Sequence, residues 1–329
     1  MKGIKALAML SGGLDSILAA KLILEQGVNV EAVNFSGFFC SCKKGGTPAG
    51  NAAKMLGIPL KVVCVGNEYL RMLRKPKHGY GRHMNPCVDC KIFMLKEAKK
   101  YAKETGASFI FTGEVLDERP MSQHMKALKI IEEESGLKGR LLRPLSAKLL
   151  PETNVERKGL IDRKKLLGIR GRSRKPQMRL AEDFGIKTYP SPAGGCLLTE
   201  KEFASRLNDL FMNKKRCSID DVTVLKVGRH FRFGRSKIIV GRNEAENKVL
   251  TVEKARNDYF FEVPVIAGPI TILQGLKTKK AVAIAAELTA FYSDAKSNTV
   301  TVNFGKEKLD RSVAVTVPAK SKVDNLRII

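Results

Sequence analysis

The sequence predicts an α/β protein in which a parallel, doubly wound sheet is followed by a second, α+β domain. In the first half of the 329-residue chain, apolar runs alternate with helical patterns. This strand–helix rhythm builds a parallel sheet that helices cover on both faces. In the second half, tightly alternating segments with turn signals indicate strands joined by turns. The length suits two domains, which we place at residues 1–185 and 186–329.

The elements of the first domain follow from the apolar runs and their boundaries. The expected strands are Ala6–Leu10, Asn29–Phe35, Leu60–Val65 and Phe109–Thr112, and the expected helices are Ser16–Gln26, Pro48–Leu56 and Cys90–Thr105. Ligands of parallel sheets bind at the carboxyl ends of the strands. We therefore expect SGGLDS (11–16) and TGEVLDERP (112–120), which follow two of these strands, to face the same crevice.

The second domain is expected to begin with strands and a helix over residues 223–250. A helix with a small-residue face follows over 276–295, and 298–305 with 311–318 are expected to form a terminal hairpin. These patterns are the basis of the α+β prediction.

The charge balance indicates a polyanionic partner. The chain has 59 Lys and Arg residues against 33 Asp and Glu, a net charge of +26, and such a field favours an extended phosphate backbone. The excess is clustered in residues 157–179 and 71–83. No apolar run approaches twenty residues and no signal-peptide pattern is present. We expect a cytoplasmic protein with no membrane contact.

The segment SGGLDS joins the first expected strand to the first helix. Backbone N–H groups at such a turn point outward beside the positive end of the helix dipole, and glycine lets an anion approach them. A Walker A loop is excluded because no lysine stands at its required place, and the Rossmann G-x-G-x-x-G is absent. A shorter phosphate cradle is predicted, with an ordinary strand-to-helix turn as the alternative.

The seven cysteines do not suggest a disulfide framework, because their number is odd and cytosolic thiols stay reduced. Cys64 and Cys217 are interpreted as small core residues. Cys40 and Cys42 form a C-x-C on a glycine-flanked loop and receive no role.

Three other cysteines carry a functional prediction. Cys87 and Cys90 form a C-x-x-C that opens a helix, where the helix N-terminus stabilises thiolates. Cys196 follows two prolines and two glycines in YPSPAGGC, a loop shaped to present it. The C-x-x-C spacing suits one metal, a redox pair or two ligands of a cluster.

Five segments together resemble the PP-loop ATP pyrophosphatases of the HUP fold, and among them the tRNA-thiolating enzymes of the thiouridine synthetase type. The segments are SGGLDS, NPCVDCKIFML, FTGEVLDERPMSQ, RPLSAKLLPET and YPSPAGGCLLT, which lie within residues 1–210. The resemblance implies that residues 1–185 are catalytic. In that family ATP adenylates a uracil carbonyl oxygen of tRNA and releases pyrophosphate, and sulfur then replaces the oxygen as AMP leaves. VGRHFRFG…IIVGRNEAEN also resembles an RNA-associated domain of ribosome quality-control factors.

The resemblance implies a set of site residues. ATP would contact Ser11, Gly12, Gly13, Leu14, Asp15, Ser16, Phe35 and Gly113. Asp15 would position Mg²⁺ or the loop itself. Glu114 is either a general acid/base or a plain loop carboxylate.

The same resemblance implies how sulfur is delivered. Cys87, Cys90 and Cys196 match the branch in which three cysteines hold a [4Fe–4S] cluster whose fourth iron binds sulfide. The alternatives are a structural zinc, with Cys40, Cys42 or His83 as a fourth ligand, and a cysteine persulfide without metal. Sulfur would come from free sulfide or a cysteine desulfurase system. The modified uridine, the carbon that receives sulfur and a homodimer stay open.

Two other functions compete with tRNA thiolation. A PP-loop ligase or amidotransferase acting on RNA or a small acid would keep the loop but has little use for three presented cysteines. A non-catalytic RNA-binding protein would not require an intact SGGLDS.

Overall fold

The computed structural model describes residues 3–36, 47–190 and 196–329. The chain divides into two compact units, Met1–Cys196 and Leu197–Ile329. The division falls after the YPSPAGGC segment, whereas the sequence placed it after residue 185. Cys40 and Cys42 lie outside the described residues.

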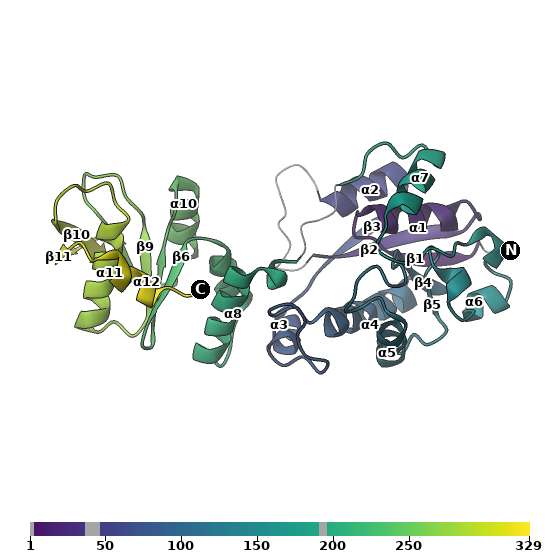
Figure 1. Cartoon of the computed structure of the whole chain (residues 1–329), viewed down its shortest axis with the longest axis horizontal. Helices are drawn as coiled ribbons and strands as arrows, with labels where there is room; N and C mark the ends of the chain where they lie inside the picture. Colours follow the sequence, from purple (N-terminus) through teal and green to yellow (C-terminus); the bar gives the residue numbers. More distant parts are fainter. Residues whose placement is uncertain (1–2, 37–46, 191–195) are drawn as a thin grey trace. The chain divides into compact units, whose positions relative to one another are not determined.

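The first unit alternates strands and helices along the chain (Figure 1). Its strands are β1 (Lys5–Met9), β2 (Asn29–Ser36), β3 (Leu60–Cys64), β4 (Phe109–Thr112) and β5 (Leu141–Leu142). Its α-helices are α1 (Leu14–Leu24), α2 (Pro48–Leu56), α3 (Asn67–Arg74), α4 (Cys87–Thr105), α5 (Met125–Ser135), α6 (Asn154–Arg157) and α7 (Lys175–Asp183). Two 3-10 helices are η1 (Ala147–Leu149) and η2 (Arg163–Lys165).

The five strands form a parallel sheet in the order β3-β2-β1-β4-β5. From β1 the chain moves to β2 on one side of β1, and after β3 it returns to β4 on the other side. A crevice therefore opens at the carboxyl end of β1, where the two directions diverge. Helices α1, α2 and α7 lie over one face of the sheet, and α4 and α5 lie over the other (Figure 1). Alternate residues of β1 pack into the two hydrophobic clusters on the two faces of the sheet: Ala6 and Ala8 face α1, and Leu7 faces α4. The predicted doubly wound sheet is confirmed.

The second unit is built on an antiparallel sheet. Its elements are η3 (Leu197–Thr199), α8 (Lys201–Asn213), α9 (Ile219–Thr223), η4 (Val224–Lys226), β6 (Arg229–Phe233), β7 (Ser236–Val240), α10 (Glu244–Glu253), β8 (Tyr259–Glu262), β9 (Thr271–Gly275), α11 (Lys279–Phe291), β10 (Thr299–Gly305), β11 (Arg311–Thr316) and α12 (Lys320–Leu326). The strand order is β11-β10-β8-β9-β7-β6. Helix α11 packs its alanine-rich side on one face, and α10 with η4 covers part of the other. The α+β prediction is confirmed.

Three local expectations need correction. Helices α3 and α5 were not predicted, because α3 lies in a strongly basic segment and α5 follows a motif read as loop. Helix α4 begins at Cys87 rather than Cys90, since Pro86 ends the preceding segment and both cysteines lie in the first turn. Cys64 is exposed, not in the core, because β3 is an edge strand and its side chains are poorly covered. Within the described residues, no helix combines the length and apolar character needed to cross a membrane.

Candidate active site

The SGGLDS loop leads from β1 into α1 and is held by its own serines. The Ser11 hydroxyl donates to the Ser16 hydroxyl at 3.1 Å, and the Ser16 hydroxyl donates to the Gly13 carbonyl at 2.8 Å. The Gly13 N–H donates to Ser11 Oγ at 3.3 Å. These bonds fix the turn at the helix N-terminus, which is the arrangement that favours an anion.

Two glycines permit close approaches to this loop. Gly12 has a φ of 82°, and a Cβ there would lie 2.2 Å from the Pro48 carbonyl carbon at the start of α2. A Cβ on Gly113, just after β4, would lie 2.5 Å from the backbone of Asp15 and Ser16. Because Gly113 has no side chain, the end of β4 can lie directly against the backbone of the loop.

A cavity of about 490 Å³ opens beside the loop at the carboxyl ends of β1 and β4. Its lining includes most of the residues that the sequence analysis expected to contact ATP, namely Ser11, Gly13, Leu14, Asp15, Ser16, Phe35 and Gly113. Gly12 lies instead under the start of α2. The SGGLDS and TGEVLDERP segments thus meet at one crevice, as predicted from the strand order. Lys91, Glu118, Arg119 and Arg174 also line this cavity and were not singled out in the sequence.

Two carboxylates that line the cavity, Asp15 and Glu118, have raised pKa values. Burial raises the pKa of Asp15, and the charges of Arg174 and Arg119 oppose this shift. Burial and then the neighbouring Asp15 charge raise the pKa of Glu118. One Asp15 oxygen is buried without a hydrogen-bond partner. Paired carboxylate oxygens, one of them unsatisfied, are the donors that Mg²⁺ prefers, so these residues fit the expected Mg²⁺.

Glu114 is enclosed by cations. Its carboxylate pairs with Lys91 Nζ and accepts from Arg143 Nε at 2.9 Å. Arg143 is buried and also pairs with Glu132. Burial alone would raise the pKa of Glu114, but Lys91 and Arg143 outweigh it and hold the pKa at about 2. Glu114 is therefore ionised at neutral pH, which favours the loop-carboxylate interpretation over a general acid.

The three predicted cysteines lie near one another. Cys87 and Cys90 occupy the first turn of α4, and both Cys87 and Cys196 act electrostatically on Cys90. The Tyr69 hydroxyl lies 3.2 Å from Cys90 Sγ. Lys91, the residue after Cys90, lines the cavity, whereas the three cysteines themselves are not among its lining residues.

The expectation of a stabilised thiolate is wrong for Cys90. Burial raises the pKa of the Cys90 thiol to about 12, the hydrogen bond from Tyr69 opposes this, and Cys196 and Cys87 add to it. Desolvation of the Cys90 thiol thus outweighs the effect of the helix N-terminus.

Asp89, between the two cysteines, has a structural role that the sequence did not indicate. It is buried, and its two oxygens accept from the backbone N–H groups of Lys77 at 2.8 Å and His78 at 3.0 Å. Part of the basic segment 71–83 is thereby fixed against the start of α4.

The cysteines fit an iron–sulfur cluster by chemistry more than by arrangement. They offer three thiols from two segments, the donor type that iron and zinc take. Within residues 3–36, 47–190 and 196–329, however, no three His, Cys, Asp or Glu side chains are close enough together to hold a metal ion. His124 has another role, because its Nδ1 accepts from the Ala127 N–H at the start of α5.

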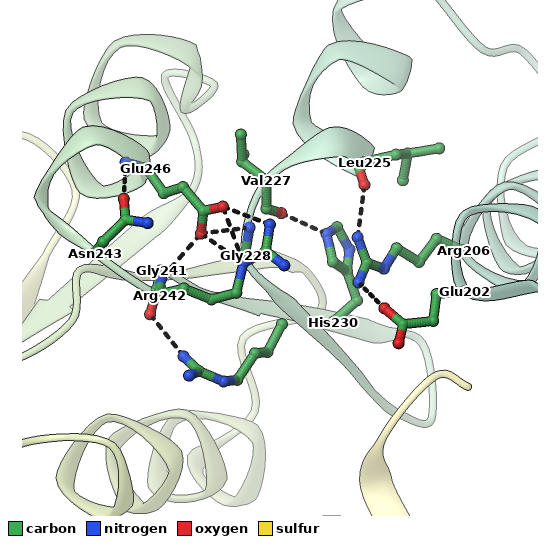
Figure 2. Close-up of polar contacts among 11 residues, drawn as sticks. Glu202, Arg206, Leu225, Val227, Gly228, His230, Gly241, Arg242, Asn243 and Glu246 are labelled. Atoms are coloured by element: carbon green, nitrogen blue, oxygen red, sulfur yellow. Dashed lines mark hydrogen bonds and ion pairs between the residues drawn. The ribbon is translucent and has the colours of Figure 1, made fainter. Parts of the chain in front are cut away.

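In the second unit, the motif VGRHFRFG…IIVGRNEAEN forms internal polar contacts (Figure 2). The Glu246 carboxylate accepts from the Gly228 N–H at 3.0 Å and from the Arg242 backbone and side chain. Asn243 caps α10 by accepting from the Glu246 N–H. Buried His230 bonds the Val227 carbonyl at 2.8 Å. These residues join η4, β6, β7 and α10 to one another.

Comparisons with known proteins agree with both halves of this description. Residues 2–148 match the family model described as thiamine biosynthesis protein (ThiI), and residues 228–325 match that of the NFACT protein RNA binding domain. A tRNA-specific 2-thiouridylase MnmA from Pelobacter propionicus is 33% identical over 119 residues, which is 33% of each chain. A probable tRNA sulfurtransferase from Thermococcus kodakarensis is 31% identical over 142 residues, 43% of this chain and 36% of the relative.

Among solved structures, the U34-tRNA thiolase NcsA from Methanococcus maripaludis with its [4Fe-4S] cluster is 20% identical. That match covers 68% of this chain and 71% of the other, with a TM-score of 0.36. The matches with the first curated relatives span about a third of those relatives' length.

The sheet order, the SGGLDS loop and the cavity beside it are the arrangement expected of a PP-loop fold in the first unit. Residues 2–148 are similar to the ThiI family, and parts of the chain are similar to relatives named as a tRNA 2-thiouridylase and a probable tRNA sulfurtransferase.

Proposed function

We propose that the protein is an ATP-dependent tRNA thiolase, which adenylates a uridine carbonyl oxygen and replaces it with sulfur, releasing pyrophosphate and AMP. The observations that support this proposal are the cavity beside the SGGLDS loop and the electrostatic proximity of the three cysteines, one of which, Cys90, directly precedes the lining residue Lys91. A ligase or amidotransferase would need the cavity but not these thiols.

The roles of the residues follow from their positions. The N–H groups of the loop at Gly12 and Gly13, together with Ser11 and Ser16, hold the pyrophosphate part of ATP. Arg119 and Arg174 line the cavity and bring positive charge to the phosphates.

Other residues hold the metal ion and the base. Asp15 and Glu118 hold Mg²⁺. Phe35 packs against adenine, and Leu14 and Gly113 complete the wall.

Sulfur delivery is assigned to Cys87, Cys90 and Cys196, which would hold a [4Fe–4S] cluster. When bound, the cluster supplies an open iron that takes up sulfide. The chain's own contribution is to hold the three thiols near one another and to bury Cys90, whose Sγ lies 3.2 Å from the Tyr69 hydroxyl. A structural zinc and a persulfide without metal are the competing arrangements, and free sulfide or a desulfurase system supplies the sulfur.

The test is an anaerobic reaction of the iron-reconstituted chain with ATP, Mg²⁺, sulfide and unmodified tRNA. Digestion to nucleosides and mass spectrometry should reveal a thiouridine that is absent without ATP. Iron, sulfide and zinc analysis of the same sample distinguishes the metal arrangements, and stoichiometric zinc without iron would contradict the cluster.

A matched cysteine variant separates function from folding. Cys87→Ser should abolish thiouridine while leaving ATP binding, whereas Cys64→Ser should leave both unchanged because Cys64 is exposed on the edge strand β3. ATP conversion to AMP with no thionucleoside would favour the ligase alternative. tRNA that does not stimulate ATP consumption would favour a non-catalytic RNA-binding protein. The cytoplasmic location and the homodimer stay predictions.

A further inference from the structure

Aromatic rings and cations come together at one end of the second unit's sheet, where several of its strands begin or end. Gly275, at the end of β9, pairs with Ser236 at the start of β7, and a Cβ on Gly275 would lie 2.5 Å from the Arg235 carbonyl oxygen. Phe233 precedes this β6–β7 turn, and Tyr259 begins β8 next to β9. We name this surface the aromatic–basic edge; its residues are Phe233, Arg235, Tyr259, Lys277, Lys280 and Arg311.

The rings of the edge are contacted by cations. Lys277 Nζ lies 5.8 Å and Arg311 Cζ 5.6 Å from the centre of the Tyr259 ring. Arg311 Nη1 also donates to the Tyr259 hydroxyl at 3.1 Å. Lys280 Nζ lies 5.6 Å from the centre of the Phe233 ring. Such contacts hold an aromatic ring in place and surround it with positive charge.

The positive charge of the edge is poorly neutralised. Across the described residues, Lys277, Lys280 and Arg235 form no ion pair, and Arg311 has Asp310 at 3.9 Å. The nearby Asp258 is buried and accepts from the Ala255 N–H and the Gln274 side chain. Charge complementarity therefore indicates an anionic partner.

The motif residues described above are less suited to such a partner. Glu246 neutralises Arg242, and His230 is buried with its Nε2 on a backbone carbonyl (Figure 2). These groups hold the fold, whereas the edge presents its cations outward: Arg235, Lys280 and Arg311 are all exposed.

We propose that the aromatic–basic edge binds an unpaired segment of RNA, with a base stacked at Tyr259 and neighbouring phosphates on Lys277, Lys280 and Arg235. Stacking on an aromatic ring beside basic side chains is how proteins take single-stranded RNA, whose bases are free to unstack. A duplex offers phosphates but no free base face. The inference rests on the proposed function, because it identifies where the tRNA substrate is held.

The first test removes three cations in the full-length chain. The variant Arg235→Ala, Lys277→Ala, Lys280→Ala is compared with Arg216→Ala, Lys296→Ala, Lys320→Ala, whose residues are exposed on the same unit and whose loss of charge is equal. Fluorescence anisotropy with tRNA at several salt concentrations is the readout. We expect the first variant to bind at least about tenfold more weakly, with a salt slope smaller by about 2. Equal affinities of the two variants would overturn the proposal.

The second test addresses stacking. Tyr259→Leu should weaken binding of an unpaired eight-nucleotide RNA about tenfold, and Tyr259→Phe should retain it. Binding of a duplex of the same sequence should not change. Equal losses for the single strand and the duplex would contradict a stacked base. Retained RNA binding by the triple variant, with loss of binding to polyglutamate, would indicate an acidic protein partner instead and overturn the proposal.

The outcome is separable from that of the proposed function. Wild-type protein that binds RNA through this edge but forms no thiouridine leaves the edge intact and contradicts the thiolase. Wild-type protein that forms thiouridine, together with a triple variant whose KM for tRNA is unchanged, overturns the edge alone.

Discussion

Glu114 is a buried carboxylate that stays ionised because two cations meet it from different elements. Lys91 comes from α4 and Arg143 from the segment after β5, and Arg143 continues the network to Glu132 on α5. Burial of a charge is costly unless it is paired and hydrogen-bonded, which this arrangement achieves. The network ties α4 and α5 to the end of β4.

We expect Glu114→Gln to destabilise the protein strongly, because Lys91 would lose this ion-pair partner and buried Arg143 would keep only Glu132. The expected loss is about 3–5 kcal/mol of unfolding free energy, measured by urea unfolding. The control Glu97→Gln breaks only the surface pair with Lys100 and should cost less than about 1 kcal/mol. Equal losses for the two variants would show that the buried network does not stabilise the fold.

The same carboxylate predicts a pH dependence. The pKa of Glu114 is lowered from 4.5 to about 2 in the folded chain. Its contribution is therefore fully present above pH 4.5 and is lost as the pH falls from there toward 2. The difference in unfolding free energy between wild type and Glu114→Gln should be constant from pH 7 to 5 and shrink at pH 3. A constant difference down to pH 3 would mean that Glu114 is not held ionised.

At the scale of elements, β4 and the PP-loop meet through Gly113, where a Cβ would fall 2.5 Å from the Asp15 and Ser16 backbone. The sequence indicated that Gly113 faces the nucleotide, and the cavity includes it. The structure adds a constraint within the chain itself, namely that strand and loop touch backbone to backbone. ATP contact by Gly113 stays a prediction.

Gly113→Ala should displace the loop and impair ATP turnover. Misplacement of a substrate by about 1 Å costs roughly a hundredfold in rate, and overpacking costs about 1–3 kcal/mol of stability. The control Gly66→Ala places a Cβ where nothing lies within 4 Å and should change neither. Pyrophosphate release and thermal unfolding report the two quantities, and near-wild-type release by Gly113→Ala would show that the loop tolerates the shift.

At the scale of the whole molecule, each of the two units has hydrophobic clusters of its own among the described residues. The first unit packs apolar residues on both faces of its parallel sheet, and the second packs its own residues between the antiparallel sheet and α11. Units with independent cores unfold as independent cooperative transitions. The chain as a whole has a net charge of +26.

Scanning calorimetry of the full chain should therefore resolve two transitions. Leu273→Ala, a fully buried change in β9, should lower only one of them, since it costs about 2–5 kcal/mol in the core of the second unit. Leu18→Ala, equally buried in α1, is the matched change for the other transition. A single transition that shifts with both variants would show that the units unfold together.

The sequence by itself determined the fold class, the strand-to-helix turn at SGGLDS and the meeting of two segments at one crevice. Apolar periodicity and strand-end motifs are local signals, and the strand-end rule holds for any doubly wound sheet. The resemblance to the PP-loop enzymes implied that Ser11, Asp15, Phe35 and Gly113 contact one nucleotide, and the cavity includes all four.

Only the tertiary structure decided the chemistry of individual side chains. Glu118 and Arg119 lie in the TGEVLDERP segment and Arg174 in the basic segment 157–179, but only the structure shows that these three side chains line the cavity. The pKa of Cys90 depends on burial and that of Glu114 on cations brought from elsewhere in the chain. Burial and charge pairing are set by residues distant in sequence, so no local pattern encodes them, and the same holds for the exposure of Cys64 on an edge strand.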